Sequence, residues 1–212
     1  MTRLNHPYAF FFATNQINAY QLWATDGTAA GTFMLTDYNP SGGGISATKA
    51  PLVINGHLLF TAGSPDLWTS DGTAAGTFDL GVHDQEQIVF NGELYFTDNQ
   101  QLWRSDGTAS GTVQVTNVQP NDLVVANGAL YFFAPTNDGI QLWKSDGSAA
   151  GTVQVTDVLN PHSNGLNAFG LTAVGGELFF LANDGTHGWQ GVGIGWHFHG
   201  NVHCDELCRC IE

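Results

Sequence analysis

Short apolar segments alternate with polar turns along most of this chain. Residues 88–115 give the clearest example, because four runs rich in β-branched and aromatic residues follow one another there. The first two runs are joined by Asn91-Gly92, which favours a two-residue hairpin because both turn positions take positive φ. This pattern predicts an antiparallel meander with tight turns. The predicted strands of the unit are 88–90, 93–96, 101–104 and 113–115.

A longer motif, Leu-Trp-x-Ser/Thr-Asp-Gly-Thr/Ser-Ala-x-Gly-Thr, occurs four times. Its tryptophans follow one another at spacings of 45, 35 and 40 residues. Repetition at a period of about 40 to 50 residues is typical of propellers and other stacked arrays. The copies cover 22–32, 67–77, 102–112 and 142–152. The residues that define them are Trp23, Asp26, Gly27, Trp68, Asp71, Gly72, Trp103, Asp106, Gly107, Trp143, Asp146 and Gly147.

The motif places two large apolar side chains next to each other. Leu102 and Trp103 are adjacent, so they must point to opposite faces of their strand. A sheet with one solvated face would alternate apolar and polar residues, so this pair favours a sheet packed on both sides. We therefore predict an all-β fold, a β-propeller of four-stranded antiparallel blades, with each motif tryptophan largely buried between blades. The predicted domain is 1–189, with four full repeats at 4–35, 52–80, 88–115 and 123–155 and a truncated fifth at 171–189.

The Asp-Gly-Thr turn has a structural interpretation and a functional alternative. An Asp side chain in a turn can accept hydrogen bonds from backbone N–H groups two residues on. The glycine after it supplies positive φ, and we expect the later glycine, Gly31 in the first copy, to take a second positive-φ position. The alternative is that the four turn aspartates bind calcium. One aspartate per turn gives too few oxygens for a site of about six to eight ligands, so we expect no metal, no cofactor and no strong calcium dependence.

These motif residues also carry a family resemblance. The segment 142–152, Leu-Trp-Lys-Ser-Asp-Gly-Ser-Ala-Ala-Gly-Thr, resembles the Glu-Leu-Trp-x-x-Asp-Gly-Thr (hyalin-like) repeat family of large bacterial secreted or surface proteins. The resemblance covers about 8–183 and implies a β-propeller with an extracellular or cell-surface location. That family has no general catalytic assignment, so the resemblance implies a scaffold rather than a reaction. The chain departs from the family at the leading Glu, which is replaced by Gln21, Asp66, Gln101 and Gln141.

Charge excludes two classes of partner. The chain has 212 residues and a formal net charge of −14, with only five Lys and Arg. A basic patch cannot be built from so few bases, so we expect neither nucleic acid nor an anionic membrane surface as a partner. No apolar run is long enough to insert into a membrane. No segment has the features of a signal peptide, and the first blade starts almost at Met1, so we interpret the chain as part of a longer protein.

Function is predicted from the contrast between two kinds of loop. The Asn-Gly and Asp-Gly-Thr turns repeat, whereas the loops at 14–20, 63–66, 98–100 and 135–140 differ. We predict a non-catalytic scaffold or binding module, with a glycan or protein as the possible ligand of these variable loops. The alternative is a glycan-acting hydrolase, which would need paired carboxylates in a cleft. The acids left unassigned by the repeat are Asp84, Glu86, Asp122 and Asp184.

The end of the chain, 190–212, does not fit the repeat. It holds residue types that zinc prefers, but their spacing matches no standard zinc arrangement. Shifting the reading frame by one base after Trp189 permits Val-Trp-Glu-Ser-Asp-Gly-Thr, so we interpret this tail as a frameshifted fifth repeat. A fifth blade without its outer strands would leave 177–182 with an unpaired strand edge that invites association. The candidate ligands in the tail are His197, His199, His203, Cys204, Cys208 and Cys210.

Overall fold

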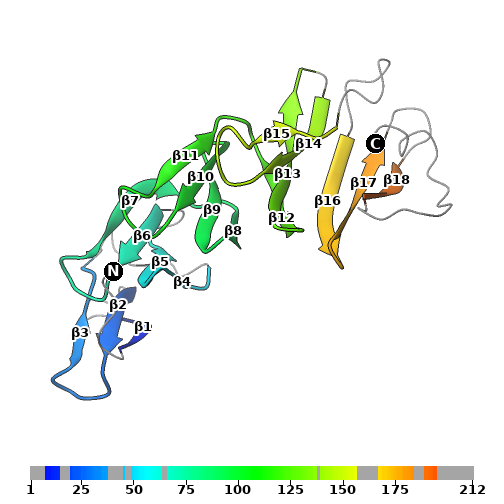
Figure 1. The fold of residues 1–212 in the computed structure, drawn as a ribbon. Coiled ribbons are helices and arrows are strands. Elements are labelled where there is room, and N and C mark those ends of the chain that lie inside the picture. The colour runs from blue at the N-terminus through cyan, green and yellow to red at the C-terminus, as the bar shows by residue number, and fades with distance from the viewer. Residues whose placement is uncertain are drawn as a thin grey trace. The chain divides into compact units, whose positions relative to one another are not determined.

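The structure is a computed structural model, and it describes residues 8–14, 20–37, 45, 49–63, 66–137, 139–156, 167–183 and 189–194. All regular secondary structure in these ranges is β, and none of the described residues lies in a helix. In the described part of the chain, eighteen strands form five antiparallel sheets of three or four strands (Figure 1). In every sheet the spatial order of the strands follows the chain order, so each sheet is a meander. The predicted all-β class and the meander of each repeat are confirmed.

The sheets correspond to the predicted repeats. The first comprises β1 (Ala9–Thr14), β2 (Tyr20–Thr25) and β3 (Thr32–Met34). The second comprises β4 (Leu52–Ile54), β5 (His57–Thr61), β6 (Asp66–Ser70) and β7 (Thr77–His83). The third comprises β8 (Gln87–Phe90), β9 (Glu93–Asp98), β10 (Gln101–Ser105) and β11 (Val113–Thr116). The fourth comprises β12 (Asn121–Ala126), β13 (Ala129–Thr136), β14 (Gly139–Ser145) and β15 (Val153–Gln154). The fifth comprises β16 (Asn167–Val174), β17 (Glu177–Asn183) and β18 (Trp189–Ile194).

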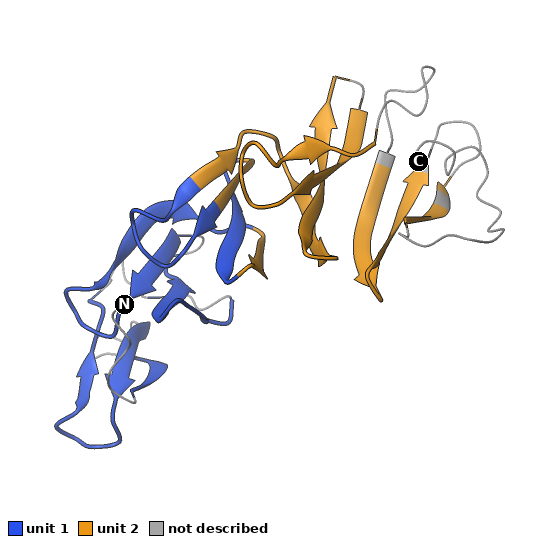
Figure 2. Cartoon of the chain, viewed as in Figure 1, with its two compact units in different colours: residues 1–85, 92–99, 104–113 blue, residues 86–91, 100–103, 114–212 orange. Residues whose placement is uncertain are grey.

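The chain divides into two compact units (Figure 2). Unit 1 contains the first two sheets, and unit 2 contains the fourth and fifth. Each unit is described by itself below. The expected first strand of the first repeat falls at 3–6, outside the described residues. The ranges of unit 1 are 1–85, 92–99 and 104–113, and those of unit 2 are 86–91, 100–103 and 114–212.

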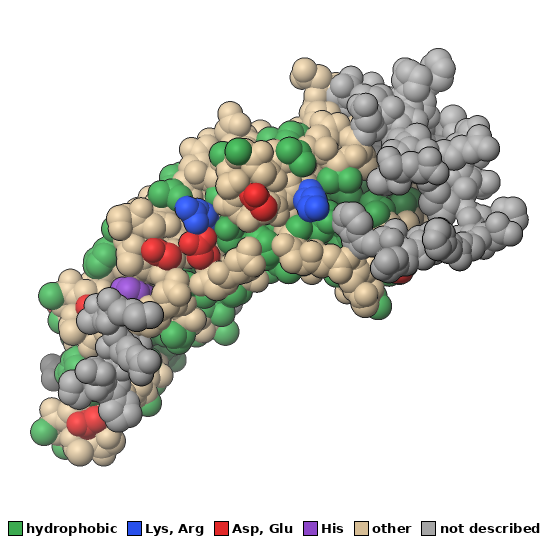
Figure 3. Space-filling view, in the orientation of Figure 1, with side chains coloured by type: hydrophobic (Ala, Val, Ile, Leu, Met, Phe, Trp, Pro, Cys, Tyr) green, Lys and Arg blue, Asp and Glu red, His purple; other side chains and the backbone are tan. Residues whose placement is uncertain are grey.

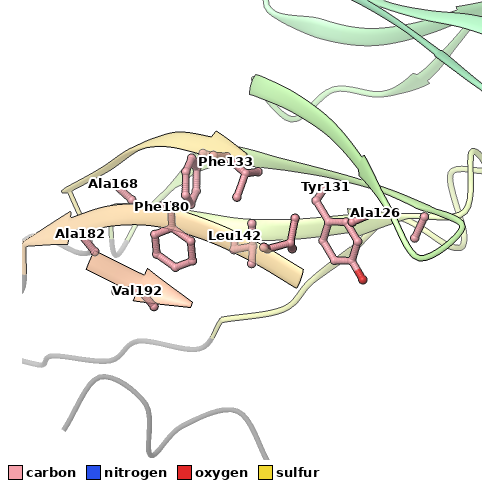
Figure 4. Packing of buried hydrophobic residues seen from close by; sticks show 11 residues of the cluster. Ala126, Tyr131, Phe133, Leu142, Ala168, Phe180, Ala182 and Val192 are labelled. Carbon is pink, nitrogen blue, oxygen red and sulfur yellow. The ribbon is translucent and has the colours of Figure 1, made fainter. Parts of the chain in front are cut away.

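The core of unit 2 lies between the fourth and fifth sheets (Figure 4). Phe133 and Leu142 are paired across β13 and β14, so they point to the same face of the fourth sheet. That face packs on Phe180 of the fifth sheet, and the Phe133 and Phe180 rings meet edge to face with centroids 5.3 Å apart. This geometry is one that aromatic pairs prefer, because the positive ring edge meets the negative ring face.

The core of unit 1 repeats this arrangement between the first and second sheets. Phe12 is paired with the motif leucine Leu22, as Phe133 is with Leu142. Its ring lies 6.1 Å from that of Phe60, which is paired with the motif tryptophan Trp68. We call the side of a sheet that carries the motif leucine its leucine face, and the opposite side its tryptophan face. In both units the leucine face of one sheet packs on the tryptophan face of the next.

The predicted two-sided packing is confirmed, but the two motif side chains contribute differently. Leu22 and Leu142 are fully buried, whereas Trp23 and Trp143 keep a minor part of their surface exposed. The leucine is short enough to be enclosed by the next sheet, while the larger indole extends to the border of the interface. None of the four motif tryptophans is exposed, so the prediction that each is largely buried is confirmed. The indole Nε1 atoms of Trp23, Trp103 and Trp143 are also buried, with no hydrogen-bond acceptor in the described part of the chain.

The fifth sheet differs from its prediction at both ends. Its first strand begins at Asn167 rather than Leu171, because a register shift between Phe169 and Thr172, with Gly170 at φ 73°, lets the strand continue upstream. At the other end β18 pairs with β17 over its whole length. The predicted unpaired edge at 177–182 is therefore wrong. The first residues of the tail form a third strand, and 195–212, with all six candidate ligands, lie outside the described residues.

Candidate functional site

The repeated turn is closed by hydrogen bonds of its own. In the first copy the Asp26 Oδ1 atom accepts hydrogen bonds from the backbone N–H of Thr28 at 2.8 Å and from its hydroxyl, also at 2.8 Å. The Thr28 hydroxyl in turn accepts from Gly31 N–H at 2.9 Å. The same three bonds recur from Asp71, Asp106 and Asp146, with a serine hydroxyl in the last copy. The expected local bonding of each turn aspartate is confirmed.

The two glycines of the turn are required for different reasons. Gly27 and its three equivalents have φ between 90° and 97°, the positive values that the sequence predicts. The later glycine, Gly31 in the first copy, is not among the positive-φ residues, so that expectation is wrong. A β-carbon on Gly31 would lie 2.1 Å from the Asp26 carboxylate, and the other three copies are equally tight. The second glycine is therefore fixed by space, because the aspartate side chain folds over it.

The turn bonds also stabilise the charged form of the aspartate. At Asp106 burial acts to raise the pKa, but the hydroxyl and N–H of Thr108 hold it below its ordinary value. At Asp146 the Ser148 hydroxyl, followed by the Ser148 N–H, lowers the pKa. Hydrogen bonds donated to a carboxylate favour ionisation in this way. The turn bonds thus favour the ionised form of the Asp106 and Asp146 carboxylates.

Some of the repeated turns also join one sheet to the next within a unit. The Asn55 side-chain amide donates to Gly92 O at 3.5 Å, and the Asn127 amide donates to Gly176 O at 2.6 Å. Both bonds run from the first hairpin turn of one sheet to the same turn of the following sheet. In the Asp-Gly-Thr turn of the third sheet, Gly107 O accepts from the Thr69 hydroxyl at 2.6 Å. The turns are therefore alike in every copy because they serve packing between sheets as well as folding of the hairpin.

Among the loop acids, Asp84 is held by a lysine. Its Oδ1 lies 2.8 Å from Nζ of Lys49, and the same ammonium donates to the backbone carbonyls of Asp84 and Gln85, each at 3.0 Å. The side chain of Asp84 is fully buried. Burial raises the pKa of Asp84, and the hydrogen bond and charge of Lys49 oppose that rise. Asp84 therefore anchors its loop in unit 1.

Glu86 and Asp122 accept backbone hydrogen bonds from the following sheet in unit 2. The Oε1 atom of Glu86 accepts from Leu123 N–H at 2.7 Å. The Oδ2 atom of Asp122 accepts from Gly170 N–H at 2.7 Å and Leu171 N–H at 3.3 Å. Both acceptors meet a first strand where its register shifts, and such a bulge releases N–H groups from the sheet ladder. Asp184 lies outside the described residues.

The structure also gives a role to a motif position that the sequence did not explain. Gln21 is fully buried, and its Oε1 accepts from the Thr36 hydroxyl at 2.8 Å. That hydroxyl accepts from Leu22 N–H at 2.9 Å. Gln141, Thr156 and Leu142 repeat this relay at 2.7 and 2.9 Å. The Gln and Thr lie 15 residues apart in both copies, and this spacing was the available sequence signal.

The described residues offer no centre for metal chemistry. Across them, no group of three or more His, Cys, Asp or Glu side chains could hold a metal ion. The nearest approach is His83, whose ring nitrogens lie 3.0 Å from Asp98 Oδ1 and 3.5 Å from Asp66 Oδ1. In the same ranges, no helix is long and apolar enough to cross a membrane. The absence of strong calcium dependence stays a prediction.

Comparisons with known proteins give no family. Neither a family model nor a curated protein matches the sequence. Solved structures with a partly similar arrangement include TolB from Acinetobacter baumannii, with 12% identity and a TM-score of 0.42 over 87% of this chain and 49% of that one. A nidogen/laminin complex gives 16% and 0.39, over 81% and 66%. A puromycin-hydrolysing peptidase from Mycobacterium tuberculosis gives 12% and 0.43, over 92% and 38%. The chain spans about half of TolB, and at these TM-scores we draw no conclusion about fold or function.

Proposed function

We propose that this chain is a non-catalytic repeat scaffold whose sheets are blades of a β-propeller and whose variable loops bind a ligand. The observation that carries the proposal is that the repeated residues form hydrogen bonds within their own turns and between neighbouring sheets. Each turn aspartate is bonded within its turn, and the Asn-Gly turns at Asn55 and Asn127 bond to the next sheet. Residues that are the same in every copy thus build and join the sheets. The variable loops carry no such common task and are available for recognition.

The contacts of the loop acids argue against the hydrolase alternative. A glycosidase needs two carboxyl groups about 5 to 10 Å apart, one acting as an acid and the other as a nucleophile or base. Asp84 is paired with Lys49, and Glu86 and Asp122 accept backbone N–H groups. A carboxylate used in this way holds the backbone, and moving it to a substrate would break these backbone hydrogen bonds. The three described candidates therefore fit structural roles better than catalytic ones.

The net charge of the chain limits the classes of ligand that it can bind. With 19 acidic residues against five Lys and Arg, the chain repels polyanions. Figure 3 shows few Lys and Arg side chains on the face in view, together with several Asp and Glu side chains. A neutral glycan or a protein is the class of ligand that this surface admits. An extracellular or cell-surface location is proposed with it, on the resemblance of the repeat to secreted and surface proteins.

The experiment uses the difference in length between the β9–β10 hairpin and the β13–β14 hairpin. In β9 and β10 the hairpin turns at Asn99-Gln100, whereas β13 and β14 continue the hairpin through 135–140. Replacing 135–140 by Asn-Gln would give the fourth sheet the hairpin of the third. We expect a neutral-glycan microarray and a panel of extracellular proteins to identify a ligand for the unmodified chain. We expect this replacement to weaken its binding at least tenfold without changing the urea midpoint.

A matched control changes a repeated turn instead. Ser148→Thr gives the fourth turn the residue of the other three and should leave binding unchanged. Release of reducing ends from any polysaccharide on the array would favour the hydrolase. A binding loss shared by Ser148→Thr would show that the loops are not the recognition element.

A further inference from the structure

In both units the leucine face of one sheet packs on the tryptophan face of the next. This packing leaves the tryptophan face of the first sheet and the leucine face of the fifth sheet without a partner sheet of their own unit. On the tryptophan face of the first sheet, Phe11 stacks on Trp23 with ring centroids 6.4 Å apart and planes 17° apart. Phe11 is paired with Trp23 as Phe60 is with Trp68. Yet Phe60 is 3% exposed against 38% for Phe11. The difference is that Phe60 is covered by the leucine face of another sheet.

The leucine face of the fifth sheet is exposed in the same way. Leu181 is equivalent in register to Phe133 and Phe12. Those two residues are paired with a motif leucine, and Leu181 is paired with Gly191 at the same position of the fifth sheet. Leu181 is 42% exposed and Phe133 only 2%. Phe169 and Trp189 flank it, with ring centroids 4.9 Å apart. The exposed large apolar side chains of this face are Phe169, Val174, Phe179, Leu181 and Trp189.

We propose that the leucine face of the fifth sheet binds the tryptophan face of the first sheet in a second copy of this chain. The proposed contact repeats an interface that the protein already makes twice. Phe133 packs on Phe180 in unit 2, and Phe12 packs on Phe60 in unit 1. In the proposed contact, Leu181 packs on Phe11 of the second copy in the same way. Repeat arrays whose end faces are apolar rather than polar are known to need a cap. The two faces differ from each other, so the interface is heterologous and its repetition gives rings or open chains rather than an isolated two-fold dimer.

A gap in the fifth sheet supports the assignment. Gly191 occupies the register position of the motif leucine, which is fully buried in every one of the four repeats. A β-carbon on Gly191 would meet no atom within 4 Å. The exposed face therefore has room for an incoming aromatic side chain beside Leu181. Phe11 is the residue that the packing rule places there.

The heterologous geometry is tested with two variants that each break one face. Phe11→Lys damages the tryptophan face and keeps the leucine face, and Leu181→Lys does the reverse. In sedimentation velocity the unmodified chain should associate increasingly with concentration. Each variant alone should stay monomeric. An equimolar mixture should form a one-to-one dimer, because it contains one intact pair of faces.

Two further variants keep the test independent of misfolding. Val153→Lys introduces the same charge at a residue that is 50% exposed on β15, outside both faces, and should associate as the unmodified chain does. Gly191→Leu fills the space that Phe11 of the second copy would enter, without adding a charge, and should weaken association about tenfold. Urea midpoints of both Lys variants should match that of Val153→Lys.

Three results would overturn the proposal. The first is a monomeric unmodified chain, which would mean that its own first sheet or tail covers the fifth. The second is self-association of either single Lys variant, which indicates a two-fold or nonspecific contact. The third is a mixture of the two variants that stays monomeric.

Discussion

A β-carbon on Gly111 would lie 2.0 Å from Oδ1 of Asp106, in space that the aspartate carboxylate already fills. The carboxylate is fixed there by the N–H and hydroxyl of Thr108, at 2.9 and 2.7 Å. These contacts hold the side chain over the end of the turn. Asp106 and Gly111 are therefore coupled, and the repeat keeps both in all four copies.

This coupling predicts a non-additive pair of substitutions. Gly111→Ala should lower the free energy of unfolding by about 1 to 3 kcal/mol, because the new methyl group overlaps the carboxylate. In an Asp106→Ala background the same change should be nearly neutral, which gives a coupling of about 1 to 3 kcal/mol. Urea unfolding of the four proteins measures the cycle. Ser110→Ala, at an exposed position in the same turn, should change stability by less than about 0.5 kcal/mol. Equal effects of Gly111→Ala in both backgrounds would refute the steric explanation.

Acid should weaken the repeated turns. The lowered pKa values of Asp106 and Asp146 mean that the folded chain binds fewer protons than the unfolded chain near pH 4. Their contribution to stability is therefore present above the unfolded pKa of about 3.9 and is lost as pH falls through the folded value. Asp146→Asn keeps an acceptor oxygen but does not titrate. The difference in urea midpoint between this variant and the unmodified chain should shrink from pH 7 to pH 3. A difference that stays constant would argue against the linkage.

The carboxylate of Asp122 should matter as an acceptor rather than as a charge. Asp122→Ala removes the partner of Gly170 N–H and Leu171 N–H and should lower the free energy of unfolding by about 0.5 to 1.5 kcal/mol, because one of these bonds is exposed to solvent and the other is partly buried. Asp122→Asn retains an acceptor oxygen, and asparagine tolerates the φ of 57° at this position, so most of the stability should return. Thermal unfolding of both variants distinguishes the two effects. An Asn variant as unstable as the Ala variant would mean that the charge itself is needed.

Burial predicts that the motif leucine is less replaceable than the tryptophan. Leu142→Ala should lower the free energy of unfolding by about 2 to 5 kcal/mol, because Leu142 is fully enclosed between two sheets. Trp143→Phe should have a smaller effect, below about 1.5 kcal/mol. The largely buried ring keeps most of its contacts, and the buried Nε1 without an acceptor is removed. Urea midpoints of the two variants give the order, and the reverse order would make the indole the main anchor.

The register of the fifth sheet bears on the frameshift interpretation. Val192 is paired with Phe180 at the position where Trp143 is paired with Phe132 and Trp68 with Phe60. The shifted reading frame places its tryptophan at this same position. A chain carrying Val-Trp-Glu-Ser-Asp-Gly-Thr from residue 191 should therefore show a higher urea midpoint than the unmodified chain. If the restored chain is no more stable, the existing tail is a native structural element, and the DNA around Trp189 would decide independently.

The sequence by itself determined the elements and the turns. Hairpin turns need particular residues, so Asn91-Gly92 and Asp106-Gly107 marked strand boundaries without any tertiary information. The adjacent Leu102 and Trp103 fixed that both faces of a sheet are packed, because neighbouring residues of a strand point in opposite directions. The turn residues and the alternation of side chains along a strand are both consequences of local backbone geometry, and the motif shows both in each of its four copies.

Only the tertiary structure decided what each repeated residue touches. Gly31 is needed because the Asp26 carboxylate folds over it, and no spacing rule reveals a contact made by a side-chain rotamer. From the sequence, Glu86 and Asp122 are candidate catalytic acids. In the structure, a bulge in the next sheet frees backbone N–H groups, and these two carboxylates accept hydrogen bonds from them. The residues that form hydrogen bonds between sheets lie 37 to 51 positions apart in the chain. Their contacts follow from how the strands of neighbouring sheets face one another, which a linear pattern of residues does not encode.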